Sequence, residues 1–175
     1  MTKNWSLLDT SSISSDHRFN QLMIMNQETR KLFPPTIFYT LAIASIILWI
    51  LFQNLILFNL PFNLLGILFI SCGIVLNLWT DSFFKRYNTT VKPDEIPSML
   101  ITTGPFALTK HPMYVGMGLI LVGESILLGS LVTFLIPIIF IVCIRKLFIP
   151  FEERTLKTWF PDEYKQYEQK IQWWN

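Results

Sequence analysis

The chain has 175 residues, enough for one domain, and carries a net charge of +2. Half of it (51%) is hydrophobic and only 15% is charged, whereas soluble domains carry about 25% charged residues. No charged residue occurs over 32–80, and Glu124 is the only one between Lys110 and Arg145. A spanning helix needs roughly 20 apolar residues, so these runs exclude a soluble domain. They predict an all-α integral membrane bundle, with membrane lipids and not nucleic acid as its surroundings.

The polar and apolar segments alternate along the chain. Residues 1–31 form a polar arm without the apolar segment of a secretory signal, and we assign 32–175 to a transmembrane domain. Four spans are predicted within it, at about 34–58, 61–79, 112–128 and 131–148. A polar segment, 81–110, separates the second span from the third.

The connection between the last two spans is very short. Gly129 and Ser130 are the only residues between them, so the two helices must form a tight antiparallel hairpin. Pro137 removes a backbone hydrogen bond from the fourth span, and we expect a kink there. Small residues on the second and third spans permit close helix packing. They are Gly66, Ser71, Cys72, Gly73, Gly116, Gly118 and Gly123.

Three residues inside the spans have chemistry of their own. Cys72 and Cys143 both fall within predicted spans, which argues against a disulfide framework, and their spacing does not support a zinc site, so no metal is expected. Glu124 lies about five residues from the Gly129 turn, and we expect it to reach toward the surface opposite the polar segments.

The basic residues define the topology. With four spans, the arm, the 81–110 segment and the C-terminal segment lie on one side of the membrane, and they carry four, four and six of the 14 Lys and Arg residues. The opposite turns carry none. The positive-inside rule therefore predicts cytosolic N- and C-termini, in a bacterial inner membrane or the endoplasmic reticulum.

Two polar clusters lie on that cytosolic side. One, Thr109 to His111 with Tyr114, stands where the third span begins, and the other, Glu152 to Arg154, follows the fourth. The hairpin returns these two ends to the same depth, so we expect an imidazole, a tyrosine and two carboxylates to line one pocket. Paired carboxylates are costly at a membrane boundary unless they are solvated or bind a cation. Residues 152–172 follow as an amphipathic interfacial helix broken at Pro161.

The sequence around these clusters resembles the isoprenylcysteine carboxyl methyltransferase family. The first motif is Gly104-Pro105-Phe106 followed by Lys110-His111-Pro112-Met113-Tyr114-Val115-Gly116, and the second is Glu152-Glu153-Arg154-Thr155-Leu156 followed by Phe160-Pro161-Asp162-Glu163-Tyr164 and Tyr167. The resemblance covers about residues 75–172. Lys110 stands where the family has Arg, and Pro161 stands where it has Gly.

The resemblance implies a methyltransferase that uses S-adenosylmethionine on a lipophilic small molecule or a lipidated substrate. The implied cofactor-binding residues are Gly104, Lys110, His111, Tyr114, Gly116, Glu152 and Glu153. Arg145 and Lys146 are the candidates to meet a substrate carboxylate. An amine acceptor would instead need a proton acceptor, such as Glu153 or water.

Three alternatives stay open at this point. The wider group of small membrane methyltransferases includes phospholipid N-methyltransferases, which would methylate an amine. Membrane sterol reductases have a comparable hairpin and use NADPH, but the Glu152–Glu153 pair would repel a phosphorylated cofactor. The third alternative is a non-catalytic membrane subunit.

Overall fold

A computed structural model describes residues 33–52, 57, 61–89 and 98–171. Residues 34–175 form one compact unit. The polar arm predicted at 1–31 lies outside the described residues, as do residues 90–97 and the last four residues of the chain. The boundary at residue 32 therefore stays a prediction.

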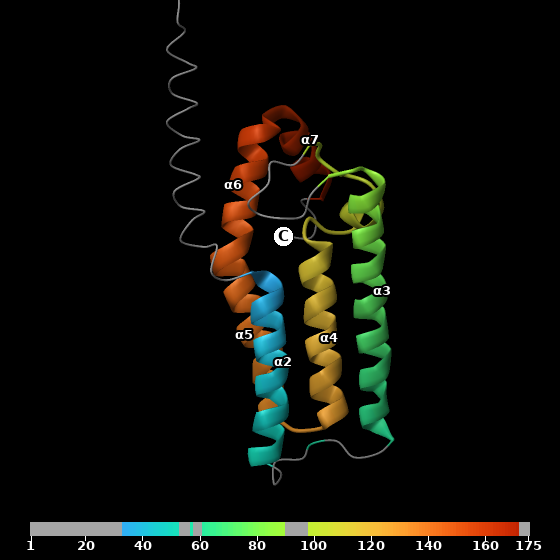
Figure 1. The fold of residues 1–175 in the computed structure, drawn as a ribbon, viewed down its shortest axis with the longest axis vertical. Coiled ribbons are helices and arrows are strands. Elements are labelled where there is room, and N and C mark those ends of the chain that lie inside the picture. Colours follow the sequence, from blue (N-terminus) through green and yellow to red (C-terminus); the bar gives the residue numbers. More distant parts are fainter. Residues whose placement is uncertain (1–32, 53–56, 58–60, 90–97, 172–175) are drawn as a thin grey trace, which may run out of the picture. The chain divides into compact units, whose positions relative to one another are not determined.

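Every regular element in the described part of the chain is helical, which confirms the all-α prediction. The elements are α2 (Pro34–Leu51), η1 (Phe62–Leu64), α3 (Leu65–Arg86), η2 (Gly104–Ala107), α4 (Pro112–Leu128), η3 (Val132–Phe134), α5 (Leu135–Cys143), η4 (Ile144–Phe148), α6 (Ile149–Trp159) and α7 (Pro161–Ile171). Figure 1 shows α5, α2, α4 and α3 running side by side, with α6 and α7 at one end.

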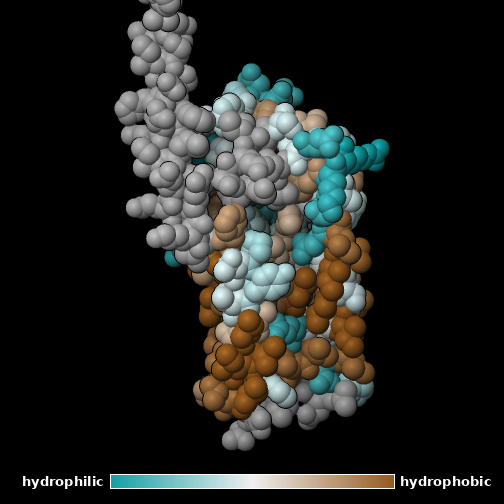
Figure 2. All heavy atoms as spheres, viewed as in Figure 1, coloured by the Kyte–Doolittle hydropathy of each residue, from teal (hydrophilic) through white to brown (hydrophobic). Residues whose placement is uncertain are grey.

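Apolar side chains cover most of the bundle. Three helical stretches of the described chain are long and apolar enough to span a membrane, namely Pro34–Leu51, Phe62–Arg86 and Val132–Trp159. The third predicted span forms a shorter apolar helix, Pro112–Leu128. Figure 2 shows hydrophobic residues over the lower part of the bundle and polar residues at its upper end. An exposed apolar surface of this extent needs lipid around it.

Two helices are longer than the sequence predicted. α3 does not end near Trp79 but continues to Arg86, so the polar segment 81–110 begins within a helix. The Lys85 ammonium lies 2.6 Å from the Asp81 carboxylate one turn earlier, and basic residues in a last helical turn interact favourably with the helix dipole. Charged residues at a helix end therefore extend this helix instead of terminating it.

The fourth span likewise does not end at Phe148, because a π-helical turn carries it into α6. The turn is η4, and after it the Ile149 N–H donates to the Ile144 carbonyl, five residues back. Pro150 follows directly and has no N–H to donate. The wider turn accommodates a proline that would break a regular α-helix, and π turns often occur at functional sites.

The predicted hairpin is present, and it is held by side-chain hydrogen bonds. Gly129 adopts φ 67°, a conformation that favours glycine, and closes α4. The Ser125 hydroxyl donates to the Thr133 carbonyl at 2.9 Å. Pro137 lies four residues after Thr133 and cannot supply the usual helical donor, so Ser125 replaces it. Pro137 falls in the first turn of α5, not at a kink in the middle of a helix.

The most extensive helix contact joins α3 to α4, and glycines form it. Gly66 of α3 opposes Gly123 of α4, and Gly73 opposes Gly116, so the two glycines of each helix are seven positions apart. A Cβ added at Gly123 would lie 2.6 Å from the Gly66 carbonyl oxygen. The two backbones are therefore in direct contact, as in other membrane helix pairs built on small residues.

The hydrophobic core lies between α2, α4 and α5. Its buried members are Ile37, Met117, Leu121, Ile136, Phe140 and Ile144. Tyr114, Phe148 and Ile149 pack against this core at its α6 end. The packed core therefore closes the bundle below the polar residues at the start of α4.

Candidate active site

The chain before α4 places His111 directly before the first residue of the helix. Gly104 adopts φ 63° and begins the short η2 turn. His111 is the N-cap of α4, and its carbonyl accepts the N–H groups of Tyr114 and Val115 at 3.1 and 3.2 Å. Pro112 fills the first helical turn, where a missing N–H costs little. The imidazole is thus attached to a rigid helix end.

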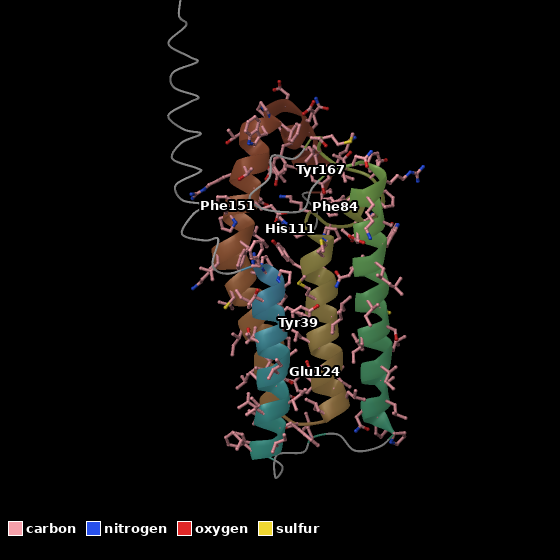
Figure 3. The ribbon with its side chains drawn as sticks, in the orientation of Figure 1. Tyr39, Phe84, His111, Glu124, Phe151 and Tyr167 are labelled. Carbon is pink, nitrogen blue, oxygen red and sulfur yellow. The ribbon has the colours of Figure 1, made fainter. Side chains whose placement is uncertain are left out.

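This helix end is recessed relative to its neighbour. From the contact between Gly73 and Gly116, α3 continues to Arg86 whereas α4 continues only to Pro112. The nine additional residues of α3 extend about 13.5 Å at 1.5 Å per residue. Figure 3 shows His111 at the upper end of α4, enclosed by α6 on one side and α3 on the other. The polar residues at the start of α4 therefore lie below the end of α3.

Two carboxylates from α6 flank the imidazole. His111 Nδ1 lies 3.4 Å from Glu152 Oε2, and His111 Nε2 lies 3.6 Å from Glu153 Oε1. The Tyr114 ring stacks on the imidazole with centroids 5.7 Å apart, and Tyr114 also lies beside Glu152. The two ends of the hairpin therefore meet as the sequence predicted, and His111, Tyr114, Glu152 and Glu153 form one cluster.

A chain of ion pairs connects this cluster to α7. Lys110 Nζ lies 3.7 Å from Glu153 Oε1 and donates a hydrogen bond to Glu168 Oε1 at 3.2 Å. Lys157 Nζ lies 3.3 Å from the same Glu168 oxygen. The Lys110 side chain is only 6% exposed, so its charge is satisfied by the two carboxylates and not by water.

Aromatic residues of α7 close the upper side of the cluster. Tyr164 and Tyr167 are buried, and the Tyr167 hydroxyl donates to the Phe106 carbonyl at 2.8 Å. Burial, together with the Glu153 and Glu168 carboxylates, raises the pKa of Tyr164 above its usual value. Burial and Glu152 raise the pKa of Tyr167 likewise. Both phenols therefore stay neutral at physiological pH.

Three buried polar atoms around the cluster have no hydrogen-bond partner. They are His111 Nε2, Glu152 Oε2 and the Tyr164 hydroxyl oxygen, each of which has a charged or polar neighbour that approaches it without hydrogen-bond geometry. Buried polar atoms almost always have partners, so three that lack one in the same small region indicate a place for a ligand. Lys110 neutralises part of the charge on Glu153, whereas the groups beside Glu152 in the described chain are the imidazole and the neutral phenols of Tyr114 and Tyr167. A cationic ligand would complement Glu152.

The two glycines expected near the cofactor face α3. A Cβ added at Gly104 would meet the Phe83 ring, and one added at Gly116 would meet the Asn77 side chain. Both glycines therefore have a packing reason to lack a side chain, and their contact with a cofactor stays a prediction.

Arg145 and Lys146 lie in the η4 turn and are exposed. Within the described residues, neither forms an ion pair with Glu152, Glu153 or any other carboxylate. The structure thus brings together five of the residues singled out from the sequence, Lys110, His111, Tyr114, Glu152 and Glu153, and leaves the basic pair outside the cluster. Their predicted role with a substrate carboxylate is untested.

Glu124, expected to reach the opposite surface, instead lies beside the hydroxyl of Ser45 on α2. Ser45 is 1% exposed. Figure 3 shows Glu124 toward the lower end of the bundle, remote from His111. A serine on the facing helix stabilises a carboxyl within the membrane better than hydrocarbon does, which explains the inward orientation.

Sequence reasoning missed two members of the ion-pair chain, Lys157 and Glu168. A signal for Glu168 was present, because it lies one turn after Tyr164 and therefore on the same helical face. Lys157 precedes the break at Pro161, so no single helical period relates it to Glu168. The link from Tyr167 to the backbone of Phe106 had no sequence signal.

Comparison with known proteins places these motifs in a wider group. The family model for phospholipid methyltransferase matches residues 62–163, more than half of the chain. The protein-S-isoprenylcysteine O-methyltransferase of Schizosaccharomyces pombe is 37% identical over 76 residues, which are 42% of this chain and 31% of that enzyme. An uncharacterized protein of Haemophilus influenzae is 40% identical over 62 residues, 35% of this chain and 98% of that protein. The match thus spans about a third of the fission-yeast enzyme, and no solved structure matches.

Proposed function

Because the chain belongs to the phospholipid methyltransferase family and is therefore a membrane methyltransferase, we propose that it uses S-adenosylmethionine to methylate a lipophilic acceptor beside His111 and Glu152. The observation that supports this most is the buried Glu152 oxygen without a hydrogen-bond partner. The cofactor carries an ammonium and a sulfonium group, and a carboxylate held beside neutral phenols suits a cation. The family match also argues against the NADPH-dependent reductase.

His111, Tyr114, Glu152 and Glu153 would hold the amino-acid end of the cofactor. Besides the Glu152 carboxylate oxygen, the imidazole nitrogen of His111 and the hydroxyl of Tyr164 can each donate or accept a hydrogen bond. This set of groups fits a ligand that carries both donors and acceptors. Lys110 would keep Glu153 in place and limit the negative charge of the site. Tyr164 and Tyr167 would exclude water from above, as their burial against Phe106 and Leu156 suggests.

When bound, the cofactor supplies a methyl group activated by a positively charged sulfur. Transfer of that methyl group to the acceptor would leave the electron pair of the carbon–sulfur bond on sulfur. The protein mainly has to align the two reactants. Charge is lost along this path, so the recessed position of His111 favours the reaction by excluding water.

Two acceptor classes have support, and we favour a carboxylate of the isoprenylcysteine type. The fission-yeast relative bears that activity in its name, and it is 37% identical to this chain over 76 residues. A carboxylate acceptor needs no general base, and Arg145 or Lys146 would meet its charge from the membrane boundary. The runner-up is a phospholipid amine, which the family description supports. In that case Glu153 would accept the proton.

Binding of S-adenosylhomocysteine and NADPH to the purified protein in detergent tests the cofactor. We expect S-adenosylhomocysteine to bind, and Glu152→Gln and His111→Ala to weaken it at least tenfold, about 1.4 kcal/mol. Asp162→Asn, on the exposed surface of α7, is the matched control and leaves binding unchanged. Binding of NADPH alone, or affinity for S-adenosylhomocysteine that ignores Glu152 and His111, would refute the proposal.

The product of methyl transfer distinguishes the two acceptor classes. Methyl-labelled S-adenosylmethionine is supplied with an N-acetyl-S-farnesylcysteine or with phosphatidylethanolamine. A methyl ester releases labelled methanol in mild alkali, whereas an N-methyl group does not. We expect the alkali-labile product, and a stable labelled lipid would establish the amine instead.

A further inference from the structure

The Lys110 ammonium is shared unequally between two carboxylates. Its Nζ donates a hydrogen bond to Glu168 Oε1 of α7 at 3.2 Å, whereas it lies 3.7 Å from Glu153 Oε1 of α6. The second distance exceeds the length of a hydrogen bond, so the contact with Glu153 is electrostatic only. Lys110 is therefore held more closely by α7 than by the carboxylate of the candidate site.

Lys110 depends on these two partners because it is shielded from water. Its side chain is 6% exposed, compared with 24% for Glu153 and 33% for Glu168. A buried ammonium that loses one carboxylate has to pair with another, since an unpaired charge away from water is costly. Glu153 is the other carboxylate beside Lys110 in the described chain. Without the charge of Glu168, the ammonium would therefore move onto Glu153.

The network around Lys110 has more negative than positive groups. Its charged members are Glu152, Glu153, Glu168, Lys110 and Lys157, which leave one unbalanced negative charge when the imidazole between the carboxylates is neutral. S-adenosylmethionine has an ammonium, a sulfonium and a carboxylate, and therefore one net positive charge. S-adenosylhomocysteine lacks the sulfonium charge and is neutral overall. The network thus complements the charge of the methyl donor and not that of its product.

We propose that Glu168 draws the Lys110 ammonium away from Glu153, and that Glu153 thereby keeps the charge with which the site favours the cationic methyl donor over its neutral thioether product. This inference rests on the proposed function. It adds a positioning residue, because Glu168 acts on the cofactor through Lys110. Selectivity is a difference between two affinities, and here it limits inhibition by the product that remains after each turnover.

The affinities for S-adenosylmethionine and S-adenosylhomocysteine, measured by calorimetry at pH 7 in an uncharged detergent without acceptor, test this selectivity. We expect Glu168→Gln to weaken S-adenosylmethionine about fivefold, as for one partly exposed charge pair, and S-adenosylhomocysteine by less than about twofold. Asp162→Asn is the matched control, because it removes the same charge from an exposed position of α7. It should leave the ratio of the two affinities unchanged.

Two further variants separate the effect of charge from an effect on folding. Lys110→Gln removes the ammonium while Lys157 still pairs with Glu168, so we expect the preference for S-adenosylmethionine to rise. In the double variant Lys110→Gln, Glu168→Gln, the ammonium that would move onto Glu153 is gone. The preference should therefore return to within about twofold of wild type, although a purely structural loss would add to the loss in Glu168→Gln.

The outcomes distinguish this inference from the proposed function. An equal loss of both affinities in Glu168→Gln, no loss, or the same change of ratio in Asp162→Asn would overturn the role of Glu168 alone. A double variant whose preference stays as low as that of Glu168→Gln would also overturn it, because Lys110 would then not carry the effect. Failure of the wild-type protein to bind either ligand would instead refute the cofactor proposal itself.

Discussion

At the residue scale, Glu168 shows how one carboxylate fixes the position of the C-terminal helix. Burial pushes its pKa up, but hydrogen bonds from Lys110 and Lys157 outweigh that effect and lower the pKa below its ordinary value of 4.5. The carboxylate is thus favoured in its charged form in the folded protein. It joins α7 to the start of α4 and to α6, three elements that no backbone hydrogen bond of the described chain connects at this point.

The lowered pKa of Glu168 predicts an acid-dependent loss of stability. A carboxylate whose pKa is lowered by folding stabilises the folded protein at pH values above its pKa in the unfolded chain. That stabilisation disappears as the pH falls through the pKa of the folded state, here from about 4.5 downward. We expect Glu168→Gln to lower the unfolding temperature at pH 7 by 2–4 °C, about 1 kcal/mol for a partly exposed network, and to flatten the decline below pH 4.5.

Asp81→Asn is the control for Glu168→Gln, since it removes an ion pair whose Lys85 is 77% exposed. It should leave the unfolding temperature unchanged within about 1 °C. An equal effect of the two substitutions in scans of thermal unfolding against pH would mean that Glu168 is an ordinary surface charge.

The sequence was most informative where charge interrupts an apolar run. His111, Glu152 and Glu153 stood out because they flank spans joined by a two-residue turn, so their proximity followed from topology alone. Gly104 and Gly116 are different, since a motif cannot tell whether a glycine makes room for a ligand or for a neighbouring helix. That distinction depends on which side Phe83 and Asn77 lie, and helix rotation sets it.

At the element scale, α3 and α4 pack by backbone contact at two glycine pairs seven residues apart. This spacing holds the contact over two turns of both helices. The start of α6 depends instead on the η4 turn, which the sequence did not reveal. The sequence predicts that the fourth span ends at about residue 148, but the wider η4 turn allows the helix to continue through Pro150.

The glycine packing predicts opposite effects at two positions of α4. Gly123→Ala places a methyl group against the Gly66 carbonyl and the Ile70 backbone, and neither can move without separating the helices. We expect a loss of 1–3 kcal/mol, in the range of other overpacked cores, measured as a lower thermal unfolding midpoint in detergent. Gly118→Ala adds the same methyl group to open space and should maintain or raise the midpoint. Equal destabilisation by both would argue against direct backbone contact.

At the scale of the whole molecule, charge separates the two ends of the bundle. The described basic residues belong to the end of α3, the start of α4, the η4 turn, α6 and α7. The hairpin turn at the other end has none. Figure 2 shows the same division between polar and apolar surfaces. The predicted cytosolic orientation of the polar end follows from this asymmetry and stays a prediction.

Cysteine labelling in intact cells tests the orientation. In a Cys72→Ser, Cys143→Ser background, a membrane-impermeant maleimide should label Leu131→Cys, in the exposed turn, without lysis. It should label Lys165→Cys, on exposed α7, only after the cells are opened. The reverse pattern would place the candidate site outside the cytosol and would exclude a cytosolic methyl donor.

The glycine pairs have a further consequence for where the reaction occurs. Ile70 and Leu127 lie directly against the opposing glycines, so sliding α3 along α4 would press these side chains against a backbone that has no room for them. The pair therefore has a single permitted register. That register determines how far His111 lies below the end of α3. It therefore also determines how deep in the membrane boundary a methyl donor has to bind in order to meet its acceptor.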